Sequence, residues 1–214
     1  MSCHPLALAA ALAAVLVAGN APAQSAPSQS PLDKPGKQDL VQPPAVPPKL
    51  EHGDRDHNLD FLFGALKAAP DEASAKNVEN RIWAIWLASG SDTCNLLMTR
   101  AKAAVDADKY DLAIRLLDAI IELRPNYVEA WNRRATVFFL KKDYANALAD
   151  LAKVLTLEPR HFGALTGLAA IMQDTGDDKD ALIAFRKALE IDPHLEGVAE
   201  KVKTLAAKLE GQDI

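Results

Sequence analysis

Cysteine is scarce in this chain of 214 residues, which contains only Cys3 and Cys94. Cys3 lies in an N-terminal segment that we expect to be removed, so the mature chain would keep a single thiol. No internal disulfide is then possible. The fold must be stabilised by packing between its elements.

An excess of positive charge is also missing. Lys and Arg total 24 against 29 Asp and Glu, which gives a formal net charge of −5. Proteins that bind DNA or RNA usually present a basic stripe to the phosphates, so the composition argues against a nucleic-acid partner. Aromatic residues make up only 6% of the chain while 49% is hydrophobic, as in a helical protein rich in Ala and Leu.

Motifs for catalysis and cofactor binding are missing as well. The sequence has no G-x-G-x-x-G or G-x-x-x-x-G-K-[ST] motif and no G-x-S-x-G frame. The acidic run 174–180 lacks the glycine and glutamate positions of an EF-hand, so we interpret it as a turn followed by a helix N-cap. His161 and His194 each follow a proline and are interpreted as loop residues. We predict a protein that is not an enzyme and needs no cofactor or metal. The alternative, a catalytic or metal site, would require His161, His194 or Cys94 to converge.

The longest apolar run is N-terminal. Residues 6–18 are uninterrupted apolar residues, and Ala21-Pro22-Ala23 follows shortly after. This pattern is typical of a signal peptide cleaved after Ala23, although no Lys or Arg precedes the run. Thirteen helical residues span about 20 Å, less than the roughly 30 Å of membrane hydrocarbon. We therefore predict a signal peptide at 1–23, no membrane span after cleavage, and a periplasmic location, with secretion as the alternative.

Prolines are concentrated in the next segment. Residues 24–55 contain seven of them, at positions 27, 31, 35, 43, 44, 47 and 48. Such a segment favours extended conformations and cannot bury enough apolar surface to fold. We predict that 24–55 is a disordered linker.

Three units of 34 residues fill the stretch from Cys94 to Leu195. Pro125, Pro159 and Pro193 stand 34 residues apart, and each ends an amphipathic run. The same spacing relates other triplets: Ala101, Ala135 and Ala169; Ala113, Ala147 and Ala181; Leu117, Leu151 and Phe185; Leu97, Trp131 and Leu165. Two runs of helical period joined by a polar turn predict one helical hairpin per unit. One hairpin cannot cover its own apolar face, so the three are expected to stack into a right-handed α-solenoid.

The repeated residues resemble the tetratricopeptide repeat (TPR) family. Its pattern is met most fully in the second unit, by Trp131, Ala135, Phe138, Tyr144, Ala147, Leu151 and Pro159. The resemblance implies an all-α fold with repeats at 94–127, 128–161 and 162–195. Arg100 and Arg134 occupy positions where the family usually has leucine. These two side chains need carboxylate partners or must reach solvent.

Helical patterns flank the three repeats. Residues 56–93 read as two helices without the marker alanines, and we predict a degenerate helical pair that caps the start of the solenoid. Cys94 is expected to be buried against this pair. Residues 196–214 are predicted to form a C-terminal capping helix and tail, with Val198, Val202, Leu205 and Leu209 along one stripe.

The resemblance also implies a binding surface, because the first helix of each TPR pair lines a concave wall. The expected groove comprises Met98, Lys102, Val105, Asn132, Arg133, Thr136, Phe139, Leu140, Thr166, Ala170 and Gln173. The family's carboxylate clamp for heat-shock chaperones is absent, because five of the clamp positions hold Met98, Lys102, Arg133, Thr166 and Ala170. The surface suits an extended or helical peptide with an acidic flank.

Together these observations favour a non-catalytic interaction scaffold in the bacterial cell envelope. Its partner would be a protein or peptide, and the chain itself would be a monomer or weak homodimer. The alternative is a cytoplasmic co-chaperone or assembly adaptor that keeps its N-terminus.

Overall fold

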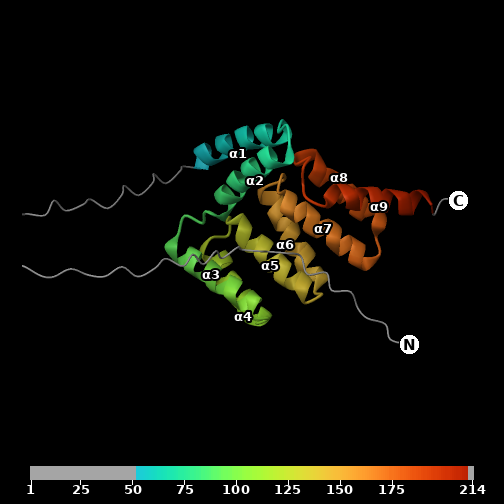
Figure 1. The fold of residues 1–214 in the computed structure, drawn as a ribbon. Helices are drawn as coiled ribbons and strands as arrows, with labels where there is room; N and C mark the ends of the chain where they lie inside the picture. The colour runs from blue at the N-terminus through green and yellow to red at the C-terminus, as the bar shows by residue number, and fades with distance from the viewer. Residues whose placement is uncertain (1–51, 212–214) are drawn as a thin grey trace, which may run out of the picture. The chain divides into compact units, whose positions relative to one another are not determined.

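The computed structural model describes residues 52–211, and their side chains from Asn58 onward. These residues form nine α-helices and no strand (Figure 1). The helices are α1 (His52–Lys67), α2 (Glu72–Leu87), α3 (Asp92–Asp106), α4 (Tyr110–Leu123), α5 (Val128–Leu140), α6 (Tyr144–Leu157), α7 (Phe162–Thr175), α8 (Asp178–Ile191) and α9 (Val198–Glu210). The all-α prediction is confirmed. None of these helices is long and apolar enough to cross a membrane.

The described residues all belong to one compact unit of the chain, Pro47–Ile214. The predicted signal peptide and most of the predicted linker lie outside the described residues. Helix α1 begins at His52, slightly before the start at residue 56 that the pattern suggested. No proline interrupts the sequence between Pro48 and Pro70, so nothing in that interval blocks an earlier helix start.

Each predicted 34-residue unit contains one antiparallel hairpin: α3 with α4, α5 with α6, and α7 with α8. The turn inside each hairpin passes through the left-handed backbone region at equivalent positions. Asp108, Lys142 and Gly176 stand 34 residues apart and have φ angles of 55°, 59° and 87°. A left-handed residue here reverses the chain direction, and the next residue is the N-cap of the second helix.

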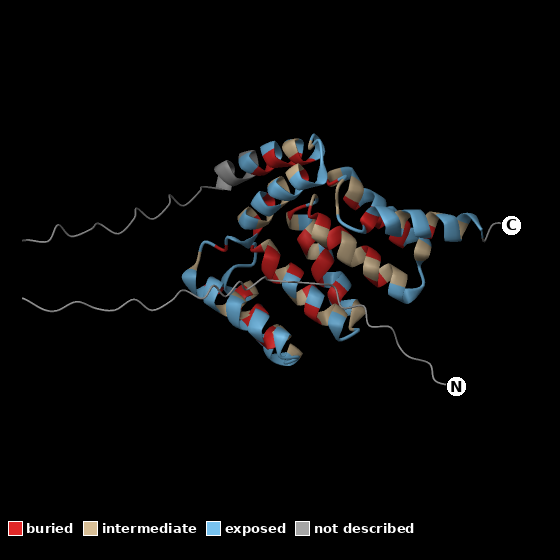
Figure 2. Cartoon of the chain, in the orientation of Figure 1, coloured by how far each residue is buried: buried red, intermediate tan, exposed pale blue. Residues whose placement is uncertain are grey.

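Small residues allow the helices of each hairpin to approach closely. Ala113, Ala147 and Ala181 are completely buried. Each occupies the same position on the second helix of its repeat, where a larger side chain would push the helix axes apart. Figure 2 shows the buried residues along the facing sides of the helices. The marker alanines of the sequence therefore lie where the hairpins pack.

Arg134 is one of the two arginines at positions where the family usually has leucine, and it is paired with two carboxylates. Its Nε and Nη2 donate to the two carboxylate oxygens of Asp150 at 2.8 and 2.7 Å, and its Nη1 donates to Asp118 at 2.5 Å. Asp118 lies on α4 and Asp150 on α6, so the guanidinium joins two consecutive repeats. The carboxylates raise the pKa of Arg134 above its ordinary value. Arg100, by contrast, is exposed to solvent.

Helices α1 and α2 form a hairpin that we call the lateral hairpin. The prediction that this pair caps the start of the solenoid is wrong. Leu96 of the first repeat corresponds to Ala130 and Ala164, which are both completely buried against the preceding repeat. Leu96 is 52% exposed, so nothing in the described part of the chain covers the equivalent face of α3.

The lateral hairpin instead lies along the loops that connect one repeat to the next. Its apolar side chains, including Leu62, Leu66 and Ile82, form a buried cluster with Phe162 of α7. Ile191 and Leu195 from the end of the third repeat pack against this cluster. The physical reason is that the loop edge of the repeats offers large apolar partners, and the apolar side of the hairpin is buried there.

The loop that follows each of the three repeats supplies a contact to the lateral hairpin and the segment after it. In the first loop, Arg124 Nη2 donates to Gly90 O at 3.0 Å and Tyr127 Oη donates to Leu87 O at 2.8 Å. In the second loop, the His161 ring stacks on Trp86. In the third, the His194 ring Nε2 lies 3.1 Å from Ala69 O. Successive loops meet successively earlier positions of the hairpin, so α2 runs back along the stack from the third repeat toward the first.

Helix α9 covers the other end of the stack. Val198 and Leu205 are buried against the third repeat in a cluster that contains Phe185. The C-terminal capping helix of the predicted fold is confirmed. Cys94 is completely buried, as expected, but within the apolar cluster of the first repeat itself, which includes Ala101 and Leu117.

Candidate functional site: the concave groove

The first helices of the three repeats, α3, α5 and α7, carry the eleven groove residues predicted from the sequence. On α3, Met98 and Val105 are half-buried and pack against the core of the first repeat. Lys102 is exposed and its Nζ lies 2.7 Å from the Asp106 carboxylate, one helical turn along. The cation expected at the first repeat is therefore already paired within its own helix.

The five groove residues of α5 differ in exposure. Asn132 is 9% exposed, whereas Arg133, Thr136 and Leu140 are exposed. Phe139 is half-buried, and its ring lies 6.0 Å from that of Tyr144 on α6, tilted by 44°. Phe139 thus presents part of its ring to the groove while Tyr144 supports it from behind.

On α7, the groove residues Thr166, Ala170 and Gln173 are all half-buried. Thr166 Oγ1 donates to Gly163 O at 2.9 Å, which satisfies its hydroxyl within the helix. This section of the groove is less polar than its residue types suggest.

Four of the predicted residues meet around a small pocket of about 120 Å³ between α5 and α7. They are Asn132, Thr136, Phe139 and Ala170. The remaining walls come from Ala135, Leu151, Gly163, Gly167 and Ile171, which the prediction did not include. The other seven predicted residues do not line this pocket. The walls are mostly apolar, so the pocket suits one apolar side chain.

Two glycines create the space on the α7 side of the pocket. A Cβ at Gly167 would meet only Leu151 Cδ2 and Cδ1, at 3.6 and 3.7 Å. Gly163 lies one turn earlier on the same helical face and also lines the pocket. Sequence reasoning missed both because a glycine carries no side chain to classify. Their i, i+4 spacing in an otherwise good helix was the available signal.

A buried polar network supports the floor of the groove. Glu129 is completely buried, and its carboxylate accepts from Asn132 Nδ2 at 3.0 Å and from Arg133 Nε at 3.2 Å. The same carboxylate lies 2.9 Å from His161 Nε2. His161 Nδ1 accepts from the backbone N–H of Ala164 at 3.0 Å. The hydrogen of a neutral His161 must then be on Nε2, which donates to Glu129.

This network fixes two groove residues. The Asn132 amide is held by Glu129, so its orientation at the pocket is set before any ligand arrives. The Arg133 side chain is 48% exposed, but its guanidinium is paired with the Glu129 carboxylate. The groove is therefore less positively charged than the count of its cations suggested.

The lateral hairpin contacts the start of α7 beside the groove pocket. Trp83 on α2 donates from Nε1 to Glu79 at 3.1 Å, and its ring lies edge-on to Phe162 at 5.6 Å. A Cβ at Gly163 would come within 2.9 Å of Trp83 Cη2. The bare backbone of Gly163 thus accommodates both the indole and the groove pocket.

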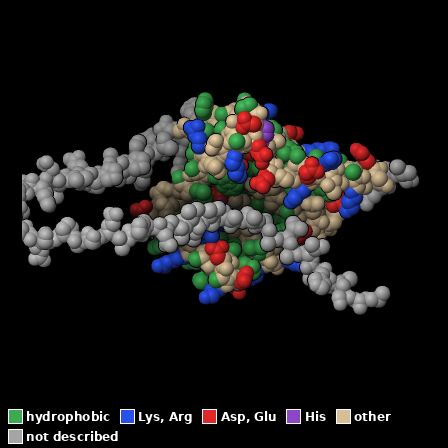
Figure 3. All heavy atoms as spheres, in the orientation of Figure 1, with side chains coloured by type: hydrophobic (Ala, Val, Ile, Leu, Met, Phe, Trp, Pro, Cys, Tyr) green, Lys and Arg blue, Asp and Glu red, His purple; other side chains and the backbone are tan. Residues whose placement is uncertain are grey.

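The histidines are placed in loops, as predicted, but neither is a simple surface residue. His161 is completely buried between Trp86 and Glu129, and His194 is half-buried against Ala69. Within the described residues, no group of three or more His, Cys, Asp and Glu side chains is arranged to hold a metal ion. Figure 3 shows basic and acidic side chains interspersed on the face in view.

Known proteins match this chain in the repeat region. Tetratricopeptide repeat family models match residues 98–157 and 138–209. A TPR repeat-containing protein of Rhizobium etli is 43% identical over 153 residues, which cover 72% of this chain and 75% of that protein. A DnaJ protein, P58IPK homolog B of Oryza sativa subsp. japonica, is 35% identical over 36% of this chain, but the match spans only 16% of that protein.

Solved structures confirm the fold. The first TPR of Spaghetti (RPAP3), solved with the HSP90 peptide SRMEEVD, superposes with a TM-score of 0.53 at 19% identity and covers 56% of this chain and 95% of its own. The Sgt2 TPR domain of Aspergillus fumigatus gives a TM-score of 0.53 at 20% identity, over 57% of this chain and 83% of its own. With its three stacked hairpins, its marker alanines and its Rhizobium relative, this chain belongs to the tetratricopeptide repeat family.

Proposed function

We propose that this TPR protein is an interaction scaffold that binds a peptide segment of a partner protein in its concave groove. The observation that carries the proposal is the apolar pocket between α5 and α7. Its walls are preformed: Phe139 is supported by Tyr144, Asn132 is held by Glu129, and Gly167 leaves the backbone of α7 accessible. A rigid pocket of this size binds an anchor side chain at low entropic cost.

The chemistry of the groove defines the partner further. An apolar side chain of a peptide would enter the pocket, while Asn132 and Thr136 offer polar groups to the peptide backbone. Arg133 keeps about half of its surface exposed at the rim and favours an acidic residue beside the anchor. The solved relative that carries the acidic peptide SRMEEVD has a similar fold. The clamp positions differ here, so we propose a different acidic peptide rather than a chaperone C-terminus.

We further propose that the protein acts in the bacterial cell envelope, where it supports envelope assembly or integrity. The apolar run 6–18 followed by Ala-Pro-Ala supports export, and the proline-rich segment 24–51 supports a tether between the exported N-terminus and the repeats. N-terminal sequencing of the native protein tests this part independently. A chain that starts at Gln24 supports export, whereas a chain that retains Met1 favours the cytoplasmic adaptor.

Comparative capture tests the groove. The full chain and its Phe139→Ala and Arg133→Ala variants would be immobilised and exposed to envelope extract, and bound proteins would be identified by mass spectrometry. The matched control is Ile183→Ala on α8, because Ile183 is 58% exposed and lies outside the groove pocket. We expect the partner to be lost with both groove variants and kept with the control. Equal capture by all four proteins would exclude the concave surface as the site.

A further inference from the structure

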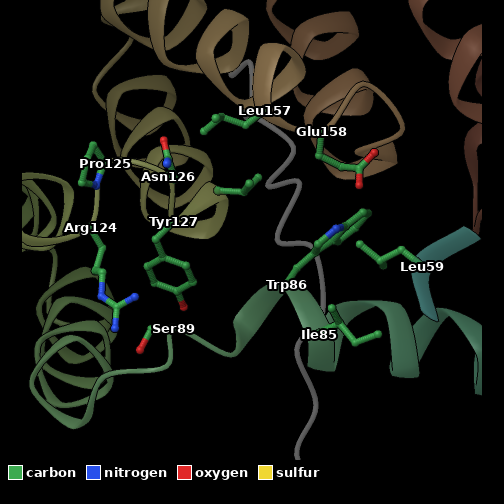
Figure 4. A pocket seen from close by; sticks show the side chains of 11 residues that line it. Leu59, Ile85, Trp86, Ser89, Arg124, Pro125, Asn126, Tyr127, Leu157 and Glu158 are labelled. Atoms are coloured by element: carbon green, nitrogen blue, oxygen red, sulfur yellow. The ribbon is translucent and has the colours of Figure 1, made fainter. Parts of the chain in front are cut away.

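A second and larger pocket, of about 410 Å³, lies between the lateral hairpin and the first two inter-repeat loops. Its apolar walls come from Leu59 and Ile85 of the lateral hairpin and from Val128 and Leu157 of the second repeat (Figure 4). The volume falls within the range of about 300–1,000 Å³ that is usual for small-molecule sites. This pocket shares no lining residue with the groove pocket.

Trp86 contributes ring surface to one wall of this pocket. Trp86 is 95% buried, since only 5% of its surface is exposed, and it lines the pocket. Its Nε1 is the one buried side-chain nitrogen or oxygen among the described residues that lacks a partner. The nitrogen itself is covered by protein atoms, so the indole offers the pocket ring surface and not a free donor.

Arg124 provides a cation at the opposite side of the same pocket. Its Nη2 donates to the carbonyl of Gly90, and no salt bridge joins it to a carboxylate within the described residues. Its charge is therefore not neutralised by an acidic neighbour. A guanidinium is the side chain best suited to a carboxylate, which it can bind through two parallel hydrogen bonds.

Three other polar side chains of the pocket are already engaged. The Glu158 carboxylate accepts from the backbone N–H and the Nε of Arg160 at 3.0 and 3.2 Å. Tyr127 Oη donates to Leu87 O, and Ser89 Oγ donates to Ser91 O or Asn95 Oδ1. Glu158 and Arg124 lie on opposite sides of the pocket in Figure 4, so an anion beside Arg124 would not face Glu158 directly.

We propose that this pocket binds an apolar carboxylate, with the carboxylate on Arg124 and the apolar body between Leu59, Ile85 and Leu157. A guanidinium and an apolar interior select an anion with a hydrophobic body over a cation or a neutral polar molecule. The same chemistry is offered by a free small acid and by the C-terminal residue of a peptide that ends in an apolar side chain. The site is independent of the groove function.

The probe is 3-phenylpropionate, titrated into the folded full chain with detection of the Trp indole N–H resonances by NMR. We expect saturable 1:1 binding that shifts the Trp86 resonance, and at least tenfold weaker binding of the neutral analogue 3-phenylpropanol and of the cation 3-phenylpropylamine. Arg124→Met is expected to weaken binding of the acid at least tenfold. The control Arg186→Met, at an exposed position on α8, leaves it unchanged.

Two further arms complete the test. Arg124→Lys keeps a positive charge but removes the paired donors, and it should weaken the acid less than Arg124→Met does. An acetylated tripeptide ending in Phe, with a free or an amidated C-terminus, separates the two sources. Tighter binding of the free-acid peptide than of 3-phenylpropionate identifies a chain end, and weaker binding identifies a small acid. Absence of saturable binding by both acids, or binding that Arg124→Met does not change, would overturn the proposal.

Discussion

The indole ring of Trp86 stacks on the imidazole of His161, with ring centroids 4.1 Å apart and planes inclined by only 13°. This contact joins the lateral hairpin to the loop between the second and third repeats. His161 also caps the N-terminus of α7 and donates to Glu129 of α5. One pair of rings therefore connects three elements that the chain order separates.

Replacing Trp86 tests how much this junction contributes to stability. Trp86→Ala removes a nearly buried ring that also contacts Phe63, Trp83 and Phe162. Removal of a buried Trp side chain lowers the free energy of unfolding by about 3–5 kcal/mol. Urea unfolding followed by circular dichroism measures the loss, and hydrogen exchange should show α1 and α2 opening before the repeats. An unchanged unfolding midpoint would mean that the lateral hairpin does not pack as described.

The exposed start of the solenoid is tested by a pair of substitutions at equivalent positions. Leu96→Ala should change the free energy of unfolding by no more than about 0.5 kcal/mol, because Leu96 is half exposed. Ala130→Leu, one repeat later, should destabilise the protein by about 1–3 kcal/mol, because Ala130 is completely buried. Chemical denaturation of both variants measures the contrast. A large loss at Leu96 would indicate that another element covers that face after all.

The two glycines of α7 are expected to respond in opposite directions to the same change. Gly167→Ala should raise the free energy of unfolding by about 0.5–1 kcal/mol, because the new Cβ makes only ordinary contacts with Leu151 and Ala is the better helix former. Gly163→Ala should lower it by about 1–3 kcal/mol, because the new Cβ would lie 2.9 Å from the Trp83 ring. Thermal unfolding compares them. Equal shifts of the same sign would argue against close packing of Trp83 on α7.

Asp192 gives a pH-dependent prediction. Burial raises the pKa of its carboxyl, and the hydrogen bond from His194 N–H offsets part of this effect. The folded state then holds the proton more tightly than the unfolded state, so the contribution of this group to stability is largest at low pH and is lost as pH rises. Asp192→Asn should be more stable than the wild type at pH 7, and the difference should shrink toward pH 4. Urea titrations at both values check the sign, and an increasing advantage at pH 4 would contradict it.

The repeats could be predicted from the sequence because their contacts recur. The same close packing is indicated three times, by Ala113, Ala147 and Ala181. The ends of the hairpins are marked by Pro125, Pro159 and Pro193. The need of Arg134 for carboxylates also followed from its position, although Asp118 and Asp150 could not be named without the register of the neighbouring helices.

The position of the lateral hairpin could not be predicted, because its contacts occur once and bridge distant parts of the chain. Trp86 meets His161, and Ala69 meets His194, without any periodic pattern on the α1–α2 side. A partial signal existed on the other side: Tyr127, His161 and Leu195 occupy equivalent loop positions and are larger than a solvent-exposed turn requires. The groove was predicted residue by residue from the family resemblance, and its Gly-lined pocket was missed because side-chain type alone does not reveal empty space.

The affinity of the captured peptide for the groove tests the central claim most directly. Isothermal titration would compare the wild type with Phe139→Ala and with the control Ile183→Ala, after circular dichroism has shown that all three are folded. We predict that Phe139→Ala weakens binding at least tenfold while Ile183→Ala stays within twofold of the wild type. Equal affinities for all three proteins would show that the peptide binds elsewhere and that the concave groove is not the functional site.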